Sequence, residues 1–142
     1  MTCDCIDAIP GAAELRDWFG GFPSFHDGYA RLQVSSDGSG WIKLRAGRMT
    51  DRTDADGYFI LEKHFAAQIT LGDLVSVSLG DFMPGELIIG ALDIRRTPVG
   101  FVIGIDTSYG LAGTIVAGKI DMAFVPLPAA DLRDAAFPEF PK

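Results

Sequence analysis

Two histidines are the residues of this chain best suited to acid–base chemistry or metal binding. Asp27 directly follows His26, and an imidazole oriented by a carboxylate is the arrangement of a general base. Neighbours on an extended chain point to opposite sides, however, so Asp27 is poorly placed to orient His26. We therefore expect His26 to be structural, shielded by Phe22 and Phe25 and hydrogen-bonded so that it fixes the chain between a helix and the first strand.

A second candidate pair is His64 with Glu62, two residues apart in a predicted strand. Residues at this spacing share one face of a strand. Such a pair could bind a metal ion or exchange a proton. A solvated strand face explains the same pattern, and it is the interpretation that we expect.

The cysteines and an acidic segment are the remaining candidates for metal binding. Cys3 and Cys5 could supply half of a zinc site, but His26, His64 and the carboxylates stand at no zinc-motif spacing from them. We expect two free thiols in a reducing compartment and no bound metal.

The segment 51–57 is rich in aspartate but does not match a calcium loop. The D-x-D-x-D-G pattern has Arg52 at its first position, and Lys63 stands where the twelfth-position glutamate would be. What remains is an acidic loop, and we predict that its carboxylates form a partner-binding surface: Asp51, Asp54 and Asp56. No phosphate-binding, dinucleotide-binding or nucleophile motif is present in the sequence, so we predict no catalytic residue and no cofactor.

Charge and hydropathy narrow the classes of partner. The formal net charge is −7, and 12 basic residues are scattered among 19 acidic ones. A nucleic-acid partner is therefore not expected, because such binding needs clustered Lys and Arg. An acidic protein suits a basic protein partner, although negative charge also serves solubility. No apolar run reaches membrane-spanning length and the first residues lack a signal-peptide pattern, so we expect a cytoplasmic protein with no membrane partner.

The hydrophobic periodicity predicts one helix followed by strands. Residues 12–19 place Leu15, Trp18 and Phe19 on one helical face, between Pro10-Gly11 and Gly20-Gly21. Period-two alternation or short apolar runs then predict seven strands, at residues 29–35, 41–46, 58–71, 74–79, 87–94, 99–105 and 114–125. Residues 47–57 are predicted as an exposed loop, and a turn is expected at residues 72–73.

This pattern predicts a mainly β protein, or α+β by strict count. We expect one domain over residues 1–142, an antiparallel meander forming a sandwich or an open barrel of about seven strands, with one short N-terminal helix and loosely ordered tails at 1–9 and 127–142. The residues expected to be buried in the predicted strand 58–71 are Phe59, Leu61, Phe65, Ile69 and Leu71. Glu62 and Gln68 should be exposed. The apolar residues on both faces of 87–94 and 99–105 predict a homodimer that buries one of these strands.

A short motif gives the chain its one family resemblance. It comprises Trp18, Pro23, Ser24, Phe25, His26 and Asp27, and the later segment 109–113 leads into the last strand. In these residues the chain resembles the bacterial immunity protein fifty family and its relatives. Gly28 stands where that family usually has alanine, and a late cysteine of the family is missing. The resemblance implies a cytosolic protein of the toxin-neutralising group, with no catalysis and no cofactor.

Two functions from different classes follow from the sequence. The first is a non-catalytic protein that binds a protein partner, such as a basic toxin domain, through an acidic surface. The alternative is a small-molecule-binding or hydrolytic β-barrel that uses His26 with nearby carboxylates.

Overall fold

The structure is a computed structural model, which describes residues 6–23, 25, 28–57, 59–80, 87–107 and 112–127. The described elements in chain order are a 3-10 helix η1 (Ile6–Ala8), helix α1 (Ala12–Phe19) and strands β1 (Tyr29–Val34), β2 (Gly40–Thr53), β3 (Phe59–Gly80), β4 (Leu87–Thr97), β5 (Gly100–Thr107) and β6 (Ala112–Pro126). Within these strands the side chains of Met49, Asp51, Phe59, Ile60, Leu61 and Leu87 are not described.

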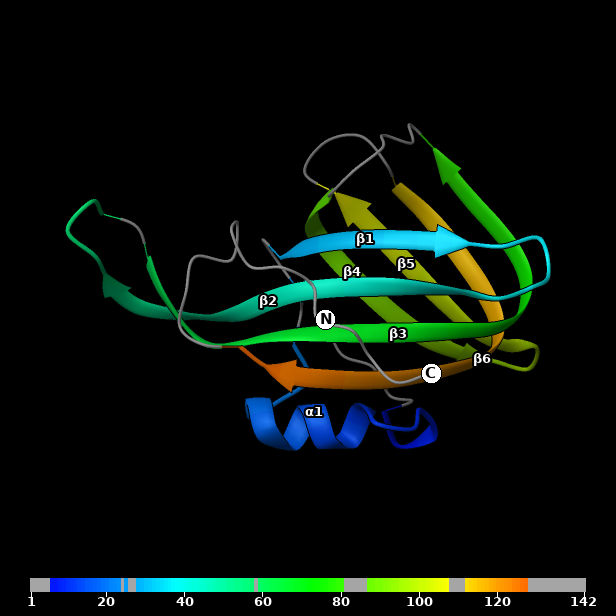
Figure 1. The fold of residues 1–142 in the computed structure, drawn as a ribbon, viewed down its shortest axis with the longest axis horizontal. Coiled ribbons are helices and arrows are strands. Elements are labelled where there is room, and N and C mark those ends of the chain that lie inside the picture. Colours follow the sequence, from blue (N-terminus) through cyan, green and yellow to red (C-terminus); the bar gives the residue numbers. More distant parts are fainter. Residues whose placement is uncertain are drawn as a thin grey trace.

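The strands form one antiparallel sheet closed into a barrel in the order β1-β2-β3-β6-β5-β4 (Figure 1). Closure depends on two residue pairs between β1 and β4, Tyr29 with Ile88 and Ala30 with Leu87. The mainly β class, the antiparallel pairing and the single short helix near the N-terminus confirm the prediction. Of the sandwich and the open barrel that the sequence left open, the structure has a barrel, but a closed one. The strands also do not form a simple meander, because β3 pairs with β6 rather than with β4.

Alternating residues of the strands point inward and fill the barrel. Ile42, Leu44, Phe65, Ile69 and Ile103 are each no more than 1% exposed. These side chains belong to one continuous apolar cluster, which the helix joins through Ala12 and Leu15. Burial of this cluster is the main stabilising contribution of the fold.

Two predicted boundaries are wrong, both at long strands. β2 continues through residues 47–53, so the predicted loop 47–57 shrinks to the turn at 54–57. β3 runs without a turn through Gly72 and Asp73, joining two predicted strands. Asp73 has a φ of 51° there, and the register with β6 shifts between Leu74 and Ser76. The turn residues thus mark a bulge that bends β3, because a bulge increases the local twist of a strand.

The N-terminal segment packs against the barrel rather than forming a loose tail over all of residues 1–9. Ile6 and Ile9 are 6% and 2% exposed. The backbone carbonyl of Pro10 accepts a hydrogen bond of 2.7 Å from the Met122 amide. This bond covers part of the β6 edge that β5 leaves unpaired, and Figure 1 shows α1 lying along β6. Residues 1–5 and 128–142 lie outside the described residues.

The predicted faces of β3 are confirmed in part. Phe65, Ile69 and Leu71 are buried and Glu62 is exposed, as expected. The prediction that Gln68 is exposed is wrong, because this residue is only 9% exposed. Its side-chain amide donates a 3.1 Å hydrogen bond to the Thr70 hydroxyl, which replaces water as the partner of that group.

Within the described part of the chain, no helix is both long and apolar enough to cross a membrane.

Candidate functional site

A hairpin made by β2 and β3 extends beyond the barrel. β1 pairs with β2 only as far as Arg45, and β6 pairs with β3 only as far as Phe65. Beyond these points the Leu127 amide donates a 2.8 Å hydrogen bond to the His64 carbonyl. Farther out, the described residues of the two strands pair with each other, at Arg48 with Glu62 and onward to Thr53 with Phe59. Figure 1 shows the resulting projection on the left of the molecule. We call residues 47–62 the arm.

The tip of the arm carries exposed carboxylates. Asp54 and Asp56 are both exposed in the turn between β2 and β3. The Asp54 carboxylate accepts a 2.9 Å hydrogen bond from the Asp56 amide, and its backbone carbonyl accepts one of 3.1 Å from the Gly57 amide. Aspartate commonly stabilises turns in this way. Asp51, the third predicted residue of the acidic loop, lies within β2, and its side chain is not described.

Two cations at the base of the arm bind the C-terminal end of α1. Arg48 donates a hydrogen bond to the Phe19 carbonyl, and Lys63 donates one of 2.5 Å to the Trp18 carbonyl. The last carbonyls of a helix have no partner within it and carry partial negative charge. The two cations satisfy these carbonyls and so link the arm to the helix. Sequence patterns do not reveal this link, because neither cation belongs to a motif.

The same cations lie over aromatic rings. The Arg48 guanidinium carbon is 5.0 Å from the Phe19 ring centroid, and the Lys63 ammonium is 5.4 Å from the Trp18 centroid. Both distances fall within the range of a cation–π interaction. The base of the arm is therefore held by hydrogen bonds and ring contacts to the same two helical residues.

Beneath the base of the arm, three aromatic side chains contact a buried phenylalanine, and a fourth packs against one of the three. The Phe65 ring centroid lies 6.0 Å from that of Trp18, 5.3 Å from Phe19 and 5.9 Å from Phe25. Phe22 packs edge-on to Phe25 at 6.1 Å. We call these five residues the aromatic corner. Edge-to-face pairs at such distances stabilise a core beyond simple burial.

The family motif enters the aromatic corner through its described members. Trp18 and Phe25 contribute rings, and Pro23 is buried. Phe25 has a φ of 61°, a backbone conformation that residues other than glycine rarely adopt. Pro23 and Phe25 are buried and Trp18 is partly buried; the structural role expected of the motif stays a prediction. Ser24, His26 and Asp27 lie outside the described residues, so the expectation for His26 stays a prediction.

His64 and Glu62 do not form the pair considered from the sequence. Lys63 between them has a φ of 51°, and the register with β2 shifts between Ala46 and Arg48. Glu62 is exposed, whereas both ring nitrogens of His64 are buried without a hydrogen-bond partner. The expectation of a solvated face is therefore wrong at His64. Among the described residues no group of three metal-ligating side chains comes together.

The one pKa shift resolved among the described groups is at the turn between β1 and β2. The Asp37 carboxylate accepts a 2.6 Å hydrogen bond from the Ser39 hydroxyl and one of 3.0 Å from the Ser39 amide. These bonds favour the ionised carboxylate and hold the pKa of Asp37 below its ordinary value of 3.8. Asp37 is fully exposed and belongs to the turn, not to the arm.

The described polar groups of the arm lie outside the apolar core of the barrel. The core cluster consists of apolar side chains from the strands and from α1. Asp54 and Asp56 are exposed at the tip of a projecting element with a fixed base. Such an element can insert carboxylates into a basic partner surface.

Comparison of the chain with protein-family models, with curated proteins and with solved structures gave no match in any of the three.

Proposed function

We propose that this protein is a non-catalytic, cytoplasmic binding protein of the immunity type, which neutralises a basic toxin domain by occupying it with the arm. The observation that carries the proposal is the arm itself: a hairpin that leaves the barrel and ends in Asp54 and Asp56, both exposed. The resemblance of Trp18, Pro23 and Phe25 to the immunity protein fifty motif supports the same class.

The fixed base of the arm also supports binding. A hairpin of two strands is only marginally stable by itself. Arg48 and Lys63 connect the arm to α1, so fewer conformations have to be lost when a partner binds. A prearranged acidic tip also speeds association with a basic surface, because long-range attraction steers the two proteins together.

The proposal is tested by neutralisation in cells. The first step is to establish whether a secreted toxin is encoded beside the gene of this chain. The C-terminal domain of such a toxin, expressed with and without the chain, is the probe. We expect the chain to restore growth and the double variant Asp54→Asn, Asp56→Asn to lose at least most of that protection. Asparagine can still accept the hydrogen bonds of the turn, so the variant removes charge and keeps the fold.

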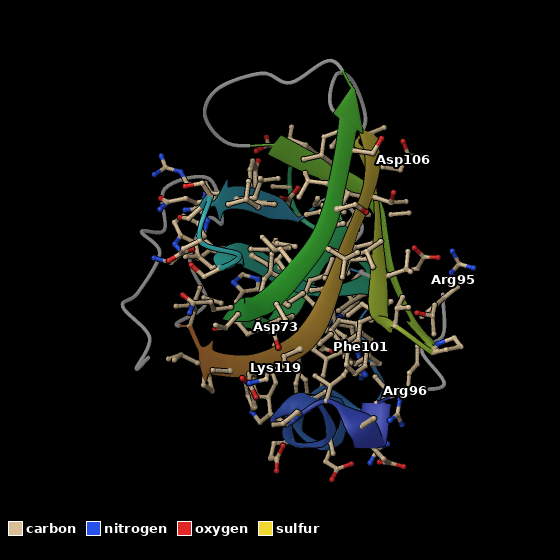
Figure 2. The ribbon with its side chains drawn as sticks, turned by 90° about the vertical axis from the view of Figure 1, so that its right-hand side faces the viewer. Asp73, Arg95, Arg96, Phe101, Asp106 and Lys119 are labelled. Carbon is tan, nitrogen blue, oxygen red and sulfur yellow. The ribbon has the colours of Figure 1, made fainter. Side chains whose placement is uncertain are left out.

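A matched control removes two carboxylates elsewhere. Asp106 on β5 and Asp121 on β6 are both exposed and lie far along the chain from the arm (Figure 2 labels Asp106). The double variant Asp106→Asn, Asp121→Asn changes the net charge by the same amount and should protect like the wild type. Equal loss of protection in both double variants would contradict the specific role of the arm, because it would show that only the total negative charge of the protein matters. Full protection when this protein is present in far fewer copies than the toxin would indicate that it acts as an enzyme and not by binding the toxin one to one.

A further inference from the structure

In the described part of the chain, the last residues of β3 have a partner strand on one side only. β2 pairs with β3 only up to Leu71, opposite Gly40. One more hydrogen bond, of 3.0 Å from the Leu74 amide to the Gly38 carbonyl, ties β3 to the β1–β2 turn. Beyond it, residues 76–80 pair with β6 alone in the described part of the chain. Figure 2 shows this end of β3 rising with β6 along one side.

This edge is unusually apolar and exposed. Val75 is 62% exposed and Val77 is 40% exposed, so two of the five exposed large hydrophobic residues in the described part of the chain lie here. The segment 74–80 reads Leu-Val-Ser-Val-Ser-Leu-Gly and contains no charge and no proline. Proteins normally protect an open edge with a charge, a proline or a covering loop. Among the described residues, the protective feature at this edge is the bulge at Val75, which lies at one end of the segment.

We infer that this edge pairs with the same edge of a second copy of the chain, antiparallel about a two-fold axis. The sequence of the segment supports a second copy of the chain as the partner. Around Val77 the order apolar, Ser, apolar, Ser, apolar reads the same in both directions. Pairing centred on Val77 sets Ser76 against Ser78 of the second copy and Val75 against its Leu79. A two-fold interface requires such self-complementarity.

The distribution of charge also favours a second copy of the chain at this edge. The chain has a net charge of −7, so two copies repel each other over most of their surfaces. The uncharged segment 74–80 is a place where they can approach without setting like charges opposite one another. The contact joins the two barrels through one continuous sheet, β6-β3 of one copy to β3-β6 of the other.

This inference places the homodimer contact on β3, whereas the sequence predicted it on residues 87–94 or 99–105. β4 pairs with β1 only at Leu87 and Ile88, but its following residues include the charges of Asp93, Arg95 and Arg96, which protect a strand edge. β5 pairs with β4 along one edge and with β6 along the other over residues 101–105, so it has no edge free for a second copy there. An edge of about five residues buries less than a standard interface. We therefore expect a weak dimer, populated at tens to hundreds of micromolar, that strengthens with salt because salt screens the repulsion between copies.

The test compares two valine-to-lysine variants by sedimentation. Val75→Lys introduces a charge at the edge, while Val99→Lys introduces the same charge at the β4–β5 turn, where Val99 is 64% exposed. We expect the wild-type mass to rise from 15.2 kDa toward twice that value with concentration. Val75→Lys should weaken association about tenfold or more, and Val99→Lys by no more than about twofold.

Amide hydrogen exchange locates the contact independently of any variant. Amides of residues 76–80 that point away from β6 should exchange more slowly at high protein concentration than at low concentration. A monomeric wild type at high micromolar concentration overturns the inference. Equal weakening by both variants, or protection that appears elsewhere than at residues 76–80, overturns it as well.

Discussion

Replacing Phe65 by alanine tests whether the aromatic corner holds the barrel, the helix and the base of the arm together. Phe65 is fully buried, and its ring packs against those of Trp18, Phe19 and Phe25. Removing a buried phenylalanine side chain costs about 3–5 kcal/mol, from lost burial and from the cavity that remains. The three ring contacts, each contributing about 0.5–1.5 kcal/mol beyond burial, place the expected loss near the upper end of that range.

The assay is equilibrium unfolding in urea, read from the midpoint and slope of the transition. Because a domain of this size has about 5–15 kcal/mol of stability in total, Phe65→Ala can leave too little for a folded baseline. Phe65→Leu keeps more of the volume and should lose about 1–2 kcal/mol. Val99→Ala, at an exposed turn, should change stability by less than about 0.5 kcal/mol. A loss below about 1 kcal/mol for Phe65→Ala would refute the reasoning, since it would mean that the corner is not tightly packed.

Further predictions concern the helix, the glycines and the β1–β2 turn. Arg48→Met removes the donor to the Phe19 carbonyl and keeps much of the apolar stem, so we expect thermal unfolding to show a loss of about 1–2 kcal/mol; an unchanged melting temperature would contradict the link. Gly11→Ala should destabilise the protein far more than Gly57→Ala, because both have a φ near 85° but only at Gly11 would the added carbon overlap the Met122 carbonyl; similar unfolding midpoints would count against this. Asp37 has a lowered pKa in the folded protein, so its contribution to stability is present above its ordinary pKa of 3.8 and is lost as pH falls through the lowered value. Asp37→Asn should therefore show a smaller fall in stability below about pH 4 than the wild type, and equal acid sensitivity of the two proteins would show that the turn contributes nothing.

Local patterns in the sequence were sufficient to predict the helix and the fold class. Ala12–Phe19 matches the prediction because Gly11 and Gly20 both adopt left-handed conformations at its ends, with φ of 86° and 85°. Alternation located inward residues such as Phe65, Ile69 and Leu71, since successive side chains of a regular strand point to opposite faces. It failed at Gln68, which is buried. Both patterns are properties of short segments.

The features that make up the candidate site depend on distant parts of the chain. Turn residues at Gly72-Asp73 and the polar segment after Ala46 predicted interruptions, but pairing with β6 and β3 carries both strands through them. The bond from Arg48 to Phe19 joins residues 29 positions apart. The acidic tip could be recognised from composition, whereas its projection beyond the barrel depends on where β1 and β6 stop pairing.

The measurement that tests the central claim most directly is the titration of the toxin domain with this chain by isothermal calorimetry at two salt concentrations. We expect saturation at one chain for each toxin domain, an affinity that falls as salt rises, and a loss of about tenfold or more for Asp54→Asn, Asp56→Asn with little change for Asp106→Asn, Asp121→Asn. No heat of binding, or an affinity that is indifferent to the charges at the tip of the arm, would contradict the account.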